Sequence, residues 1–99
     1  MIIVTKIKYP PESAKEIASR FLEAPQVPSY LDKHGPYFTS SMDDGIIGMS
    51  VYKLEKADLA EANEFLGNYM ATYFGVSGFK YEIQPYFEAE EGLKMIGMG

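Results

Sequence analysis

The dipeptide Asp44-Gly45, near the middle of the chain, is the feature that most constrains the fold. It lies between residues 37–43 and 46–54, two runs that carry β-branched, aromatic and methionine side chains. Asp-Gly is a preferred pair for the central positions of a type I′ turn, which joins two antiparallel strands. The sequence therefore predicts a tight hairpin in which Ser41 lies opposite Gly48.

Strand and helix patterns flank this hairpin on both sides. Residues 2–9 and 79–86 alternate between apolar and polar side chains, which predicts a strand near each end of the chain. Helical spacing of apolar side chains predicts one helix that begins next to Pro11 and is stopped by Pro25. The same spacing predicts a second helix over residues 58–74.

Two strand–helix units joined by one hairpin predict an α+β sandwich, with a four-stranded antiparallel sheet and two helices on one face. The first and third strands should lie at the centre of the sheet, and residues 25–36, with three prolines, should be irregular. The chain is expected to form a single domain over residues 1–99, with residues 87–99 as a C-terminal tail or an extra edge strand. The side chains expected under the helices are Ile3, Ile7, Phe38, Met42, Ile47, Met49, Val51, Phe79, Tyr81 and Ile83. Those expected on the opposite face are Ile2, Val4, Lys6, Lys8, Thr39, Ser41, Ser50, Glu82 and Gln84.

Composition excludes several classes of protein and site. The 99 residues include no cysteine, which excludes disulfides, thiolate metal sites and cysteine nucleophiles. The net charge is −5 and Arg20 is the only arginine, which argues against nucleic-acid binding. No apolar run reaches the ~18 residues that span a bilayer, and residues 1–4 are typical of a strand and not of a secretion signal. We therefore expect a cytoplasmic protein with no nucleic-acid or membrane partner.

The order of these elements, in a chain of this length, resembles the dimeric α+β barrel superfamily, whose members have a ferredoxin-like βαββαβ fold. The resemblance rests on Ile2–Tyr9, the helix from Ser13, the Asp43-Asp44-Gly45 hairpin, the helix Asp58–Phe74 and the strand Phe79–Tyr86. It implies a homodimer in which two sheets face each other across a two-fold axis, with ligands between sheet and helices. Members of that superfamily include small monooxygenases that need no cofactor, lactone isomerases and haem-binding enzymes. Function does not follow from fold alone.

His34 is the only histidine, in the segment that leads into the second strand. Histidine titrates near neutral pH and is the usual general base, so His34 is the candidate catalytic residue. We favour the plainer interpretation, an exposed loop histidine. No cofactor or metal is expected, because the carboxylates in residues 43–44 and 88–91 lack a recognisable ligand spacing.

The chain has eight tyrosines and no tryptophan. All of them except Tyr9 could line a ligand pocket between helices and sheet, Tyr52 and Tyr86 included. The five selected as candidate ligand-binding residues are Tyr30, Tyr37, Tyr69, Tyr73 and Tyr81. Tyr69 and Tyr73 are one helical turn apart and so share a face of the second helix. Aromatic residues at helical spacing usually fill a core, and we favour that interpretation.

Three functions stay open at this point. The first is a homodimer that binds a small aromatic or apolar molecule without catalysis. The second, implied by the resemblance, is a cofactor-independent enzyme of monooxygenase or isomerase type. In that enzyme His34 would act as the base, and Tyr30, Tyr37 or Tyr73 would orient the substrate. The third is a structural or interaction module that acts through residues 93–98. The sequence does not decide whether the protein is an enzyme, and we rank the binding protein first.

Overall fold

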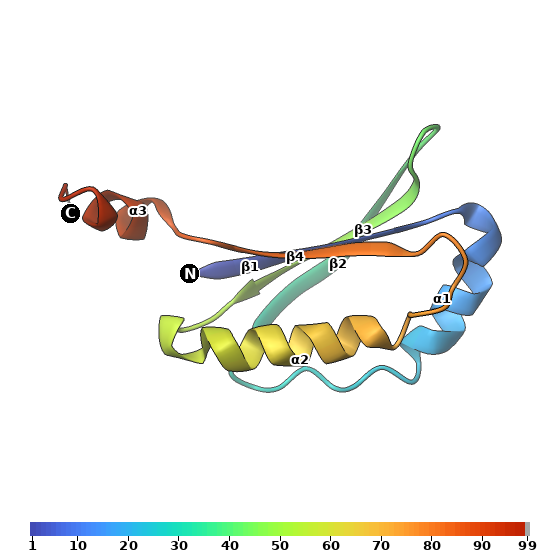
Figure 1. The fold of residues 1–99 in the computed structure, drawn as a ribbon, viewed down its shortest axis with the longest axis horizontal. Coiled ribbons are helices and arrows are strands. Elements are labelled where there is room, and N and C mark those ends of the chain that lie inside the picture. The colour runs from blue at the N-terminus through green and yellow to red at the C-terminus, as the bar shows by residue number, and fades with distance from the viewer. Residues whose placement is uncertain (99) are drawn as a thin grey trace.

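The computed structural model describes residues 1–98 and contains one four-stranded antiparallel sheet in the order β2-β3-β1-β4. Two helices, α1 and α2, lie on the same side of this sheet (Figure 1). The first and third strands occupy the centre, as predicted. At this coarse level the architecture is consistent with a ferredoxin-like arrangement, to which a third helix is added. The elements are β1 (Ile2–Tyr9), a 3₁₀ turn (Pro11–Ser13), α1 (Ala14–Phe21), β2 (Asp32–Ser41), β3 (Gly45–Lys53), a second 3₁₀ turn (Lys56–Asp58), α2 (Leu59–Ala71), β4 (Lys80–Tyr86) and α3 (Ala89–Met95).

Strand β1 has the faces that its alternation predicts. Ile3, Thr5 and Tyr9 are buried under the helices, whereas Lys6 is exposed on the other side. Successive side chains of a strand point to opposite faces, so one buried side chain fixes the orientation of the whole strand. Because β1 is central, its register also fixes which residues of β3 and β4 face the helices.

Strand β2 begins at Asp32 and not at residue 37, so the prediction of irregular structure up to residue 36 was wrong for its last part. The pairing with β3 is interrupted between His34 and Tyr37, where the register shifts. This irregularity contains Gly35 and Pro36, and proline is tolerated in a sheet at bulges and on edge strands such as β2.

The hairpin register also differs from the prediction. Ser41 pairs with Gly45 and not with Gly48, a displacement of three residues along β3. A type I′ turn needs positive φ at both central residues. Gly45 has a φ of +74°, but no residue other than glycine has positive φ, so Asp44 does not take up that conformation. The chain turns instead through residues 42–44, where the Asp44 N–H donates a hydrogen bond to Ser41 Oγ at 3.0 Å.

An odd displacement exchanges the two faces of a strand, which corrects the expected core. Ser50 faces the helices and is buried, although it was expected on the opposite face. Met42 lies fully exposed at the hairpin tip, and Phe38 and Tyr81 are about half exposed. The side of the sheet opposite α1 and α2, here called the helix-free face, carries three residues expected in the core: Ile47, Met49 and Val51.

Two clusters of buried side chains join α2 to the sheet. One contains Tyr9, Ile17, Tyr69, Met70, Tyr73 and Val76, and the other contains Ile3, Leu31, Tyr52, Ala62 and Leu66. Residues 22–31 run alongside α2 (Figure 1), and Leu31 from this segment belongs to the second cluster. The broad apolar face predicted for the second helix is therefore confirmed.

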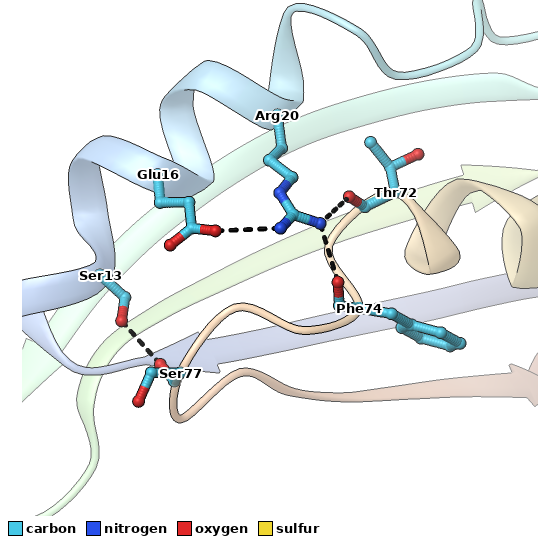
Figure 2. Close-up of polar contacts among 6 residues, drawn as sticks. All are labelled: Ser13, Glu16, Arg20, Thr72, Phe74 and Ser77. Atoms are coloured by element: carbon cyan, nitrogen blue, oxygen red, sulfur yellow. Dashed lines mark hydrogen bonds and ion pairs between the residues drawn. The ribbon is translucent and has the colours of Figure 1, made fainter.

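Polar contacts attach α1 to the end of α2 (Figure 2). Arg20 Nη1 donates hydrogen bonds to the carbonyl oxygens of Thr72 at 3.2 Å and Phe74 at 2.8 Å. These carbonyls lie at and just beyond the C-terminal cap of α2, where unsatisfied acceptors and the helix dipole favour a cation. The Ser13 hydroxyl donates to the carbonyl oxygen of Ser77 at 2.6 Å and forms no helix cap, so this side chain makes a tertiary contact.

The C-terminal segment forms α3 and not an extra edge strand, which corrects that alternative for residues 89–95. The Glu88 N–H donates to the Glu91 carboxylate at 3.0 Å at the start of this helix. Figure 1 shows α3 beyond the end of the sheet that carries the N-terminus, away from α1.

Candidate functional site

A cavity of about 640 Å³ lies between the sheet and the two helices α1 and α2. Its volume falls within the range typical of small-molecule sites. Its lining combines apolar walls from both helices with hydroxyl groups from the sheet and α2. The lining residues are Thr5, Ile7, Tyr9, Ala14, Lys15, Ile17, Ala18, Ser19, Phe21, Leu22, Lys33, Pro36, Phe38, Gly48, Ser50, Tyr52, Tyr69, Met70 and Tyr73.

Small side chains on the two central strands help to leave this space open. Thr5, Gly48 and Ser50 face the helices at the middle of the sheet, where larger residues would fill the gap. A Cβ at Gly48 would lie 2.9 Å from Phe38 Cε1 and 3.1 Å from Ile7 Cγ1, so the glycine lets these side chains close over the strand. The cavity thus follows from small residues at positions where the buried face of a sheet normally carries larger apolar ones.

Four tyrosines surround the polar part of the cavity, and all four are buried: Tyr9, Tyr52, Tyr69 and Tyr73. Burial raises the pKa of Tyr52 to about 12, although the neighbouring hydroxyls of Ser50 and Thr5 act in the opposite direction. Burial is also the main cause of the raised pKa values of the other three phenols. The four groups therefore stay protonated at neutral pH and can donate hydrogen bonds to a bound molecule.

Lys33 contributes a cation to the cavity. Its position on β2 pairs with Tyr52 on β3, so it faces the helices, and its side chain is partly buried. The Nζ atom lies 5.9 Å from the ring centroid of Tyr52 and 5.4 Å from that of Tyr69. Cation–π attraction of this kind stabilises the ammonium group there. Burial nevertheless lowers the pKa of Lys33, because the apolar surroundings disfavour its charged form.

Apolar side chains from α1 and β2 make the outer part of the cavity. Phe21 is 47% exposed, Leu22 is 85% exposed and Phe38 is 59% exposed. All three line the cavity and also reach its solvent side. A grouping of exposed apolar residues at the edge of a cavity is typical of a binding site.

The structure brings only two of the predicted site residues into this cavity, Tyr69 and Tyr73. Tyr37 pairs with Met49 and therefore lies on the helix-free face. Tyr30 packs against the second core cluster, and Tyr81 stacks with Phe79 on the outer part of the sheet, at 5.8 Å between ring centroids. Neither Tyr30 nor Tyr81 lines the cavity.

His34 lies on the helix-free face as well, because it pairs with Val51. Its Nε2 lies 3.1 Å from Asp32 Oδ2, and both side chains are exposed. The interpretation of an exposed histidine agrees with this position, but the residue lies in strand β2 and not in a loop as predicted. The carboxylate two residues earlier in the sequence is its partner, as the geometry of a strand permits for side chains on one face.

Sequence reasoning missed Lys33, Thr5 and Ser50 as lining residues. Thr5 had a usable signal, because it lies between Ile3 and Ile7 on the apolar face of the first strand. A hydroxyl at a helix-facing position is a group that needs a partner. The other residues depended on the start of β2 and the register of β3, which the prediction had misplaced.

Other kinds of site receive no support from the part of the chain described. No three acidic or histidine side chains within residues 1–98 are arranged so that they could hold a metal ion. None of the helices formed by these residues is both long and apolar enough to cross a membrane.

Comparison of the sequence with protein-family models gives no match, and comparison with curated proteins gives no significant relative.

Proposed function

We propose that this protein is a homodimer that binds a small, largely apolar molecule in the cavity between its sheet and helices. The observation that supports binding is a cavity of about 640 Å³ with apolar walls and buried hydroxyl donors. A few fixed polar groups within a mostly apolar lining give a site both affinity and orientation. Several lining residues reach solvent, so a molecule has a way in.

The proposed dimer uses the helix-free face. Ile47, Met49 and Val51 follow one another on this face of β3, and Val4 on β1 pairs with Val51; all four are only partly buried within one chain. Lys6 and Lys8 of β1 pair with Met49 and Ile47 on the same face. An apolar stripe along a central strand favours a partner that covers it. A second copy of the chain is a suitable partner, since a two-fold axis brings the same patch of both copies together. The resemblance to dimeric α+β barrels agrees with this arrangement.

Mass spectrometry of the purified protein tests both parts of the proposal. Under native conditions we expect a dimer with additional mass that disappears when the same sample is denatured. The variant Ser50→Leu places a branched apolar side chain in the cavity and should lose the additional mass. Ser29→Leu makes the same change at an exposed loop position outside the cavity and should keep it. Additional mass that persists in Ser50→Leu would contradict binding in this cavity.

The dimer surface has its own pair of variants. Met49→Lys places a charge at the centre of the helix-free face and should give a monomer. Met95→Lys makes the same change at an exposed position of α3 and should leave the dimer intact. A dimer in Met49→Lys and a monomer in Met95→Lys would instead place the interface at the C-terminal segment, as an interaction module that acts through residues 93–98 requires.

The cavity does not bring together the residues that the enzyme interpretation combines. His34 and Tyr37 lie on the helix-free face, whereas Tyr73 lines the cavity on the other side of the sheet, so within one chain the histidine does not reach a molecule beside Tyr73. A general base must lie within hydrogen-bonding reach of the proton that it takes. We therefore propose binding as the function and assign no catalytic role to His34.

A further inference from the structure

The charges around the cavity differ from those of the chain as a whole. The chain has 14 acidic and 9 basic residues. Among the described residues that line the cavity, two are lysines, Lys15 and Lys33, and none is aspartate or glutamate. An acidic protein thus presents a locally positive cavity, and like charges around a site repel a ligand of their own sign.

Lys33 has no carboxylate partner within the part of the chain described. The side-chain ion pairs there join Lys8 to Asp44, Arg20 to Glu16 and His34 to Asp32. Its neighbour Asp32 is engaged with His34 on the helix-free face. A partly buried ammonium group with no counter-charge is costly, and burial of charge in proteins is normally accompanied by pairing.

Hydroxyl groups share the cavity with this ammonium. The rings of Tyr52 and Tyr69 lie beneath it, and the hydroxyls of Thr5 and Ser50 lie in the same cavity. Protonated phenols and an ammonium group together stabilise an anion, and charge-assisted hydrogen bonds are the stronger kind. The rest of the lining is apolar, so the polar end of a ligand has one favourable place and its body has another.

We infer that the molecule bound in the cavity is an apolar carboxylate, with its carboxylate on Lys33 Nζ and its aromatic or aliphatic body against α1. This inference rests on the proposed function, namely that the cavity holds a small molecule. A single interior cation suits a monoanion better than a phosphate ester, which carries more charge. Lys15, exposed at the cavity on α1, attracts the anion from solvent without being required for its final position.

Two probes with the same ring system separate the carboxylate from the apolar body. Naphthoate carries a carboxylate at neutral pH, and naphthalenemethanol is its neutral counterpart. Their affinities would be measured by fluorescence titration of the ligand-free protein, purified after denaturation and refolding. Lys33→Met keeps the length of the side chain and removes the charge, whereas Lys33→Arg keeps the charge. Lys53→Met removes an exposed positive charge on the helix-free face and serves as the matched control.

We expect the unmodified protein to bind naphthoate more tightly than naphthalenemethanol. Lys33→Met should weaken naphthoate binding by about ten-fold and leave naphthalenemethanol unchanged. Lys33→Arg should retain the preference for the carboxylate, and Lys53→Met should change neither affinity. If Lys33→Met loses affinity for both probes equally, or keeps the preference for naphthoate, Lys33 does not bind the carboxylate. Either result would leave the proposed binding function unaffected. Failure of both probes to bind the unmodified protein would count against the proposed function itself, and this inference would fall with it.

Discussion

Replacement of Arg20 by alanine tests how α1 is held against the rest of the molecule. The guanidinium group donates to the carbonyl oxygens of Thr72 and Phe74, at 3.2 and 2.8 Å. It also forms an ion pair with Glu16 one turn earlier in α1, with Nη2 2.9 Å from Oε1. Alanine removes all three contacts and preserves helix propensity, so the loss measures the tertiary attachment shown in Figure 2.

The expected loss follows from these contacts. Each hydrogen bond from a charged donor to a partly exposed carbonyl contributes about 1 kcal/mol. The exposed ion pair within the helix contributes only about 0.4 kcal/mol. Arg20→Ala should therefore lower the free energy of unfolding by about 2 kcal/mol. For a domain of this size that corresponds to a fall in Tm of about 10 °C.

Urea unfolding followed by circular dichroism provides the assay. The denaturation midpoint should fall while the slope m stays constant, because the surface exposed on unfolding hardly changes. Glu16→Gln is the matched control, since it removes the ion pair alone and should cost about 0.4 kcal/mol. If Arg20→Ala costs no more than Glu16→Gln, the two carbonyl contacts contribute nothing and the attachment of α1 must lie in its apolar side chains.

Three further predictions concern the cavity. Burial raises the pKa of Tyr52 to about 12, so the stability that its neutral phenol contributes is complete below pH 10 and is lost as the pH rises towards 12. In Tyr52→Phe this alkaline loss of stability should be smaller by about 1 kcal/mol, as measured by urea unfolding at several pH values. Gly48→Val should cost about 2 kcal/mol, because its side chain meets Phe38 and Ile7, and an unchanged midpoint would show that both neighbours move aside. Lys33→Met should raise the unfolding free energy of the ligand-free protein by about 0.5 kcal/mol, since it removes an unpaired and partly buried charge. A lower value would show that the cation–π contacts already compensate for that charge.

The alternation and helical periodicity of the sequence were sufficient to predict most of the strands and helices. Residues 2–9 have the predicted faces, and the apolar spacing in residues 58–74 places α2 against the sheet. These patterns depend on local geometry and on burial along one element, which a single sequence records directly. The order of strands followed from connection rules that admit few alternatives.

A pocket between helices and sheet was predicted with Tyr69 and Tyr73 in its lining, but the residues from β2 and β3 were not, because they depend on two details that are not local patterns. One is the turn, in which Gly45 alone takes positive φ and Asp44 does not, so that the strand pairing moves by three residues. The other is the early start of β2, in a segment whose prolines and glycine indicated a loop. Together these errors hid Lys33 and turned Ser50 to the wrong face.

The irregularity in β2 has a consequence for which changes of chain length the protein can accept. Lys33 and His34 are consecutive, and the first faces the cavity while the second faces the opposite side of the sheet. Gly35 and Pro36 together lie opposite the single residue Ser50, so β2 carries one residue more than β3 at this point. Loss of one of these two residues would leave Lys33 opposite Tyr52 and His34 opposite Val51, and both side chains would keep their directions. Loss of both residues would exchange the two directions, so that the ammonium group would leave the cavity and the imidazole would enter it. The edge strand can therefore lose one residue at the irregularity without altering either surface, whereas the loss of two alters both at once.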